Sequence, residues 1–158
     1  MIAALLALAL ASTQPAPDPV AEAEAVIDRM HAAAARADGP AYFALFTPDA
    51  RFIGTDATER WTLDAFKAYA QPHFSRGQGW TYRPHDRVAT LAPGECRCVV
   101  WFDELLDNDA YGLTRGSGVL RLTADGWTVP VALGRGGILA NKREGDGATP
   151  AGVHRIVG

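Results

Sequence analysis

Two adjacent carboxylates and one arginine are the residues of this chain whose types best fit acid–base chemistry. Asp103 and Glu104 stand side by side, and Arg115 lies in the next strand-like segment. A carboxylate enclosed by apolar side chains has a raised pKa and can act as a general base. A neighbouring guanidinium can stabilise an oxyanion. Asp103, Glu104 and Arg115 are therefore the candidate catalytic residues, and a structural ion pair between Arg115 and either carboxylate is the alternative.

Strand geometry restricts how these two carboxylates can be used. Successive side chains on a strand point to opposite faces, so Asp103 and Glu104 cannot both point inward without a bulge. Glu104 shares its face with Phe102, and Arg115 shares its face with Ser117. The sequence predicts that one carboxylate enters the interior, without saying which.

Large aromatic side chains predict a hydrophobic pocket for a small molecule beside these charges. The candidate ligand-binding residues are four aromatic side chains and one hydroxyl: Trp61, Trp80, Phe102, Tyr111 and Ser117. Aromatic residues dominate burial in any core, so a purely structural role is the alternative for each of them.

The remaining reactive residue types predict no metal site and no cofactor. The four histidines are scattered without metal-ligand spacing: His31, His73, His85 and His154. Cys96 and Cys98 form a single Cys-x-Cys pair. In an extended strand these two side chains share a face but lie too far apart for an unstrained disulfide, so both are interpreted as small core or pocket residues.

Helices at the start of the chain must position this pocket. Asp18 caps a first helix, whose apolar residues recur at helical spacing until Gly39 stops it. A short second helix covers 40–46. A third helix, capped by Thr62, is expected to end or bend at Pro72.

After these helices the pattern changes to strand-like segments. The expected strands cover 50–54, 80–91, 96–105, 113–122 and 127–133. Three turn-forming groups separate the later strands, at 92–94, 107–109 and 125–126. Helices followed by a run of neighbouring strands predict an α+β fold, with helices packed on one face of an antiparallel sheet.

Composition predicts one ordinary globular domain behind a leader. The chain has 158 residues, of which 48% are hydrophobic and 21% charged, and its net charge of −3 argues against nucleic acid as a partner. Residues 1–19 combine a short apolar run with a Pro-rich linker, a pattern typical of a secretory signal segment. The sequence therefore predicts export to the periplasm or medium, and a buried or frayed N-terminal helix is the alternative.

Three segments together resemble the SnoaL-like branch of the nuclear transport factor 2-like superfamily. They are Phe-Thr-Pro-Asp-Ala-Arg-Phe-Ile-Gly at the start of 46–61, Trp-Phe-Asp-Glu-Leu-Leu at 101–106, and Tyr-Gly-Leu-Thr-Arg-Gly-Ser-Gly-Val-Leu at 111–120. The resemblance covers about 20–128, within a domain placed at 20–130. It implies a cone-shaped roll, in which a bent sheet wraps the N-terminal helices and leaves a pocket at the open end.

The same resemblance implies a range of activities and a homodimer formed through the sheet. Members of this superfamily include small-molecule binders, isomerases, hydrolases and cyclases. Such domains normally finish with a long strand after the corner at Gly126-Trp127. Here Pro130 interrupts that strand, which is expected to be cut short or to be completed by Val129–Leu133 with one defect.

Residues 131–158 resemble the start of an L,D-transpeptidase catalytic domain, which cross-links peptidoglycan. The resemblance rests on the run Lys142–Gly152, with Asp-Gly-Ala-Thr-Pro at its centre, and implies association with the cell wall. The catalytic His and the Ser-x-Gly-Cys-x-Arg motif of that family do not follow within this sequence.

The sequence thus predicts a small-molecule-binding SnoaL-like protein with a hydrophobic pocket, whose specific activity it does not define. Any catalysis is expected to be acid–base chemistry in that pocket. One alternative is a truncated or fused L,D-transpeptidase lacking its catalytic His and Cys, with the front domain as an accessory module. Another is a purely structural dimerisation domain.

Overall fold

Three helices form the layer that covers the sheet. The computed structural model describes residues 18–54, 58–133, 138–139 and 149–150, and its helices are α1 (Pro19–Ala35), α2 (Gly39–Phe43) and α3 (Leu63–Phe74). Asp18 caps α1, accepting a hydrogen bond from the backbone N–H of Val20 at 3.0 Å. The helix ends before Gly39, because Ala37 adopts a φ of 54° and turns the chain into α2.

The third helix tolerates a proline in its last turn. Thr62 caps α3 by accepting a hydrogen bond from the backbone N–H of Ala65 at 3.2 Å. The helix does not end at Pro72, because α3 continues to Phe74, and the expected alternative of a bend at Pro72 stays a prediction. So close to the C-terminal end, the missing N–H of a proline removes only one intrahelical hydrogen bond.

Six strands form one mixed sheet. They are β1 (Phe46–Ile53), β2 (Arg60–Thr62), β3 (Arg83–Leu91), β4 (Val99–Asn108), β5 (Gly112–Thr123) and β6 (Gly126–Leu133), in the spatial order β2-β1-β6-β5-β4-β3. Strands β3 to β6 form an antiparallel meander, whereas β1 pairs with β6 in parallel. A hairpin fixes an antiparallel direction only between consecutive strands, and β1 and β6 are far apart in sequence.

The closing strand is completed with one irregularity at Pro130. In the ladder with β5 the pairing breaks between Thr128 and Val131, and in the ladder with β1 it breaks between Val129 and Val131. In the ladder with β5 the break includes Pro130, which has no N–H to donate, whereas in the ladder with β1 residues 47–50 of β1 are also left out of the pairing. The strand nevertheless lies between β1 and β5 and joins the two parts of the sheet.

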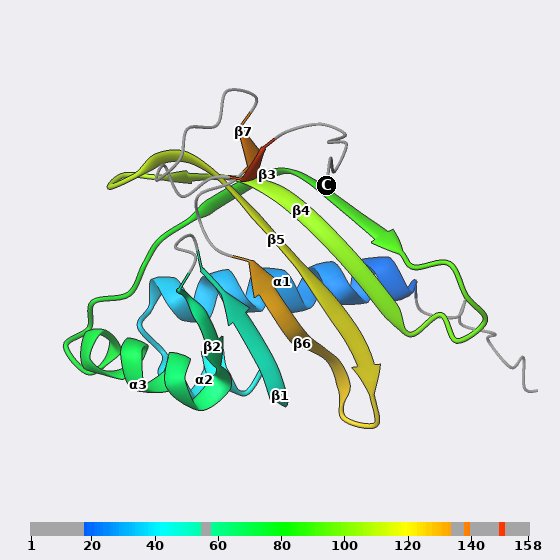
Figure 1. Cartoon of the computed structure of the whole chain (residues 1–158), viewed down its shortest axis with the longest axis horizontal. Coiled ribbons are helices and arrows are strands. Elements are labelled where there is room, and N and C mark those ends of the chain that lie inside the picture. The colour runs from blue at the N-terminus through cyan, green and yellow to red at the C-terminus, as the bar shows by residue number, and fades with distance from the viewer. Residues whose placement is uncertain (1–17, 55–57, 134–137, 140–148, 151–158) are drawn as a thin grey trace, which may run out of the picture.

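The helices and the sheet enclose one apolar core, giving the predicted α+β cone-shaped roll. Figure 1 shows α1 crossing behind the sheet, with α2 and α3 beside β1 and β2 at one end. Along β4 the buried positions alternate with more exposed ones, as expected for a strand with one covered face. Tyr42 of α2 contacts five aromatic rings at centroid distances of 5.2 to 6.2 Å: Phe43, Phe46, Phe66, Phe74 and Trp80.

The structure corrects the interpretation of the two cysteines. Cys96 and Cys98 lie in the loop between β3 and β4, not in a strand, and they form a disulfide with a Cα–Cα distance of 5.1 Å. Arg97 between them has a φ of 47°, which folds the chain and brings the two Cα atoms within bonding range. Both cysteines are therefore part of a surface loop rather than small residues of the core or pocket.

Several sequence-based predictions fall outside the described residues. The signal-like segment lies in 1–17, and most of the stretch that resembles an L,D-transpeptidase lies beyond 133. Within that stretch the structure describes only the parallel pairing of β7 (Ile138–Leu139) with β8 (Thr149–Pro150). No helix in the described ranges is both long and apolar enough to cross a membrane.

Candidate functional site

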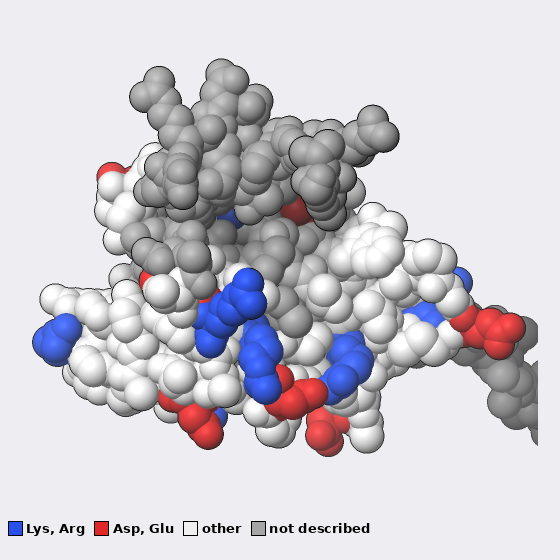
Figure 2. All heavy atoms as spheres, viewed as in Figure 1, with Lys and Arg blue, Asp and Glu red and all other residues white. Residues whose placement is uncertain are grey.

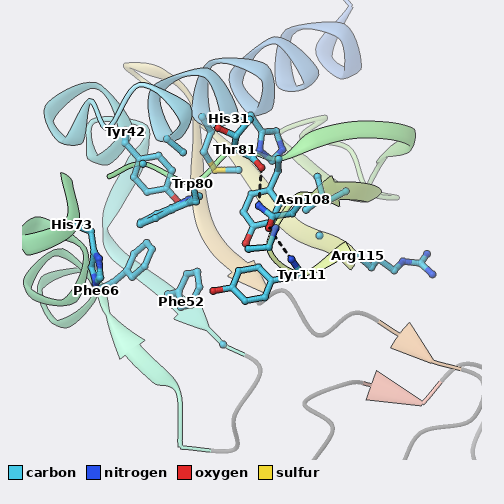
Figure 3. Close-up of a pocket in the computed structure, with 18 of the residues that line it drawn as sticks. His31, Tyr42, Phe52, Phe66, His73, Trp80, Thr81, Asn108, Tyr111 and Arg115 are labelled. Atoms are coloured by element: carbon cyan, nitrogen blue, oxygen red, sulfur yellow. Dashed lines mark hydrogen bonds between the residues drawn. The ribbon is translucent and has the colours of Figure 1, made fainter. Parts of the chain in front are cut away.

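A cavity of about 550 Å³ lies between the helices and the inner face of the sheet. Figure 3 shows aromatic rings gathered on one side of it, with His31 and Asn108 on the other. The aromatic side is lined by Tyr42, Phe52, Trp61, Phe66, Tyr69 and Trp80. Phe52 stacks on Phe66 with a centroid distance of 4.1 Å and an interplanar angle of 14°. These faces offer a flat apolar surface to a bound ring.

Glu104 is the buried carboxylate at the polar side of the cavity. Its side chain is 1% exposed, and both of its oxygens are engaged. Oε1 lies 2.6 Å from Nε2 of His31, and Oε2 accepts a hydrogen bond from Nε of Arg87 at 2.7 Å. On β5 the residue opposite Glu104 is Gly116, where a Cβ would lie 2.8 Å from Leu106 and 3.4 Å from Oε1. Glycine at this position leaves the space that the carboxylate occupies.

A bulge on β3 turns Arg87 toward this carboxylate. His85 pairs with Leu105 and Val88 pairs with Asp103, so Asp86 and Arg87 together stand opposite Glu104. Asp86 adopts a φ of 49° at this irregularity. Bulges of this kind re-aim a side chain, and here the re-aimed group is the cation that compensates a buried anion.

Arg87 also bonds to the first helix, so it links two layers of the fold. Its Nη1 donates to Asp28 at 2.8 Å and to the backbone carbonyl of Glu24 at 3.4 Å. Burial lowers the pKa of the Arg87 guanidinium, but its hydrogen bonds to Glu104 and Asp28 outweigh this effect and raise the pKa overall. Arg87 therefore remains a fixed positive charge behind Glu104.

Two further polar side chains complete the wall. Asn108 is 8% exposed, and its Nδ2 donates to the carbonyl of Thr81 at 2.8 Å while its Oδ1 accepts from the backbone N–H of Tyr111 at 3.1 Å. Asn108 thereby fixes the loop that carries Tyr111. Burial, with a smaller contribution from Tyr82, raises the pKa of the Tyr42 phenol well above its usual range, so this hydroxyl stays protonated.

The predicted catalytic residues separate onto two faces of the sheet. Glu104 points into the cavity. Asp103 points away from the cavity and forms an ion pair with Arg115 on the outer face, with 2.7 Å between Oδ2 of Asp103 and Nη2 of Arg115. Arg115 borders the cavity through its position on β5, and Figure 3 shows its guanidinium turned away. The structural ion pair considered for Arg115 is thus present, with Asp103 as its partner.

The predicted ligand-binding residues lie together around the cavity. Trp61, Trp80, Phe102 and Tyr111 line it, and Ser117 borders it on β5 beside Gly116. Trp61 is on β2 and Phe102 is on β4. Trp80 and Tyr111 lie in the loops before β3 and β5, and Ser117 is on β5. Contact between a ligand and these residues stays a prediction.

Sequence reasoning missed the partners of Glu104. His31 was considered only as a metal ligand, yet it lies on the helical face formed by Ile27 and Ala34, which are buried. A polar residue on the buried face of a helix was the signal that could have identified it. No local sequence pattern predicted the bulge on β3 that brings Arg87 to the same carboxylate.

The site shows no clustered metal ligands. Among the described residues, no group of three His, Cys, Asp or Glu side chains is arranged to hold a metal ion.

Sequence comparison identifies the family of this domain. The model for the SnoaL-like domain matches residues 23–130, which include every element from most of α1 to most of β6. The chain belongs to the SnoaL-like family. No curated protein matches the sequence significantly.

Solved structures share the fold of this SnoaL-like domain at low sequence identity. One is a nuclear transport factor 2-like protein of unknown function from Pseudomonas putida, with 15% identity, a TM-score of 0.60, and coverage of 72% of this chain and 83% of that chain. Another is a candidate scytalone dehydratase from Novosphingobium aromaticivorans, with 9% identity, a TM-score of 0.58, and coverage of 72% and 80%.

A third similar structure is a ketosteroid isomerase-like protein from Erwinia carotovora atroseptica. It has 19% identity, a TM-score of 0.51, and coverage of 75% of this chain and 96% of that chain. At such identities the likeness establishes the nuclear transport factor 2-like fold and nothing finer. The family match ends at residue 130, so the L,D-transpeptidase resemblance of 131–158 stays a prediction.

Proposed function

We propose that this SnoaL-like protein binds a small, flat, largely apolar molecule that carries one polar group. The observation that supports this most directly is the division of the cavity into an aromatic side and a polar side, built around a buried carboxylate. A volume of about 550 Å³ lies within the range of small-molecule pockets, roughly 300–1,000 Å³. Similar structures named as a candidate dehydratase and an isomerase-like protein support a small-molecule ligand.

Binding can be tested with 2-naphthol, a flat two-ring molecule with one hydroxyl, by calorimetric titration. We expect saturable binding with one site and a rise in melting temperature. Trp61→Ala should weaken binding about tenfold, because Trp61 contributes one of the stacked faces of the cavity. Trp101→Ala is the matched control, because Trp101 is 47% exposed and does not line the cavity.

Equal effects of the two tryptophan substitutions would contradict a ligand site in the cavity. So would a titration without saturation for the unaltered protein. The comparison holds the type of substitution constant, so it separates a loss of ligand contact from a general loss of aromatic packing.

The export predicted from residues 1–19 belongs to the same proposal. The Cys96–Cys98 disulfide supports it, because disulfides persist mainly in oxidising compartments. The intact mass of the protein from its native cells would show removal of the leader and the presence of the disulfide. A mass that retains the leader and two free thiols would overturn this part of the proposal.

A further inference from the structure

His31 lies on the cavity wall and is hydrogen-bonded to the buried carboxylate of Glu104. Glu104 itself is poorly placed to take a proton from a ligand. Its Oε1 is held by His31 at 2.6 Å and its Oε2 by Arg87 at 2.7 Å. Both carboxylate oxygens are thus already engaged by side chains of the protein. Glu104 is thus suited to orienting a partner rather than to proton transfer.

The hydrogen bond to Glu104 selects the tautomer of His31. An ionised carboxylate only accepts hydrogen bonds, so Nε2 of His31 carries the hydrogen. The lone pair of the neutral ring is therefore on Nδ1. No hydrogen bond to Nδ1 is present among the described residues, which leaves it the basic nitrogen of the ring. A carboxylate behind a histidine also stabilises the imidazolium formed when the ring accepts a proton.

We propose that His31 is the proton-transferring residue of the cavity, and that Glu104 and Arg87 are positioning residues that hold it in the basic tautomer. This rests on the proposed function, since it requires a ligand in the cavity. The substrate it would take is a flat, largely apolar ring compound that carries one acidic hydrogen. In this proposal the aromatic side holds the ring, and His31 of α1, which lines the cavity, receives the proton.

The charged groups behind His31 are paired with one another. Glu104 and Arg87 compensate each other, and Asp28 adds a second carboxylate on the far side of Arg87. Tyr82 contacts the imidazole edge to face at a centroid distance of 6.4 Å. When Nδ1 takes the proton, the new positive charge forms beside Glu104, which keeps its negative charge throughout. The electron pair of the broken bond to hydrogen stays on the substrate, and the proton returns to substrate or to water.

The test uses 5-nitrobenzisoxazole, a flat bicyclic probe that reports proton abstraction by a change in absorbance. The base removes the ring C–H proton, the electron pair of that bond forms the nitrile, and the N–O bond breaks. The product is a cyanophenolate, and the imidazolium gives its proton to solvent. The full-length protein is expected to accelerate this elimination, and His31→Gln should lose most of the acceleration, about a hundredfold. His85→Gln is the matched control, because His85 is on the outer face of β3 and 42% exposed.

Glu104→Gln tests the positioning role. The amide can donate to Nε2 while its carbonyl accepts from Arg87, which would move the hydrogen of His31 to Nδ1 and block the base. We expect kcat to fall at least about tenfold with KM unchanged. In ¹⁵N spectra, Nδ1 of His31 should resonate as an unprotonated nitrogen in the unaltered protein and as a protonated one in the variant. A merely structural role would not move the tautomer.

Three outcomes would overturn the inference: a wild-type rate no higher than that of His31→Gln, loss of the rate in His73→Gln instead, or an Nδ1–H tautomer in the unaltered protein. Titration with 2-naphthol separates these from failure of the proposed function. Binding that persists in His31→Gln, without any rate in the unaltered protein, would contradict proton transfer while leaving the ligand site intact. If the unaltered protein does not bind 2-naphthol, this result contradicts both the proposed function and the proton-transfer role of His31.

Discussion

Two neighbouring carboxylates of this chain have opposite environments because strand side chains alternate. Glu104 is 1% exposed and held by two nitrogen donors, whereas the Asp103 side chain is 41% exposed and pairs with Arg115 on the outer face. A buried ion pair and a surface ion pair differ strongly in what their disruption costs. The two positions therefore provide a matched comparison within a single strand.

Glu104→Leu should destabilise the protein by about 3 kcal/mol, because it removes the buried carboxylate partner of Arg87 and leaves the exposed Asp28 to compensate this mostly buried charge. Asp103→Leu is the control, since it breaks an ion pair that is partly exposed to solvent and should cost less than about 1 kcal/mol. Urea unfolding of both variants measures the difference. Equal midpoints would show that Glu104 contributes no more to stability than its surface neighbour.

Tyr42→Phe should make the protein less sensitive to alkali. The Tyr42 phenol has a raised pKa in the folded state because it is buried, against an ordinary value of 10.0. Above that value the unfolded chain loses this proton while the folded protein keeps it, so stability falls as pH rises. Melting temperatures measured from pH 8 upward should decline more steeply for the unaltered protein than for the variant. Parallel curves would contradict this assignment.

The candidate site could be predicted from sequence only as far as residue types allow. Alternation showed that one of Asp103 and Glu104 points inward, and the aromatic residues indicated a cavity wall. The choice of Glu104 depended on the register of β4 against β5, which no local pattern specifies. The contact between His31 and Glu104 joins residues 73 positions apart, so it exists only in the folded molecule.

At the scale of elements, the segment before β3 is held against the end of α1. A Cβ placed on Gly79 would lie 2.1 Å from the carbonyl oxygen of Ala34 and 2.9 Å from the backbone nitrogen of Ala37. The obstacle is backbone, which cannot move aside as a side chain can. This close approach positions Trp80 and Thr81 on the cavity wall.

Gly79→Ala should therefore destabilise the protein by about 2 kcal/mol or more and weaken 2-naphthol binding. Arg76→Ala, at a nearby exposed position that does not line the cavity, should leave both properties nearly unchanged. Thermal unfolding and calorimetric titration of the two variants provide the measurement. A Gly79→Ala protein with unchanged melting temperature would contradict the close packing of this segment on α1.

The disulfide closes a very small loop and should stabilise the protein little. Cys96 and Cys98 are separated by one residue, and the entropy that a cross-link removes from the unfolded chain grows with loop length, so a loop of three residues gives only about 1.6 kcal/mol. Reduction should lower the melting temperature by only a few degrees and leave ligand binding intact. A large loss of stability on reduction would show that the loop supports the β3–β4 ladder more strongly than its size suggests.

Elements with a strong local signal were predicted well, and those fixed by distant contacts were not. The cap at Asp18 and the meander of later strands follow from residues within a few positions of each other. The disulfide was missed because Arg97 adopts a positive φ, which turned an expected strand into a tight loop. The parallel pairing of β1 with β6 was missed because no turn connects these strands.

At the scale of the whole molecule, one face of the described structure carries charges of both signs. On the described part of the face shown in Figure 2, basic and acidic side chains are interspersed. Arg121 and Asp49 are one such pair, with a distance of 3.3 Å between β5 and β1.

The parallel ladder between β1 and β6 sets the order in which the protein can assemble. Strand β1 is made early, but its partner arrives only with Gly126–Leu133, after the whole β3–β5 meander. Long-range pairing forms slowly because a large loop must close first. We expect pulse-labelling hydrogen exchange during refolding to show protection first in β4 and β5 and last in β1 and β2. The aromatic side of the cavity would then be the final part to form, and a newly made chain would be unable to hold its ligand until β6 has inserted.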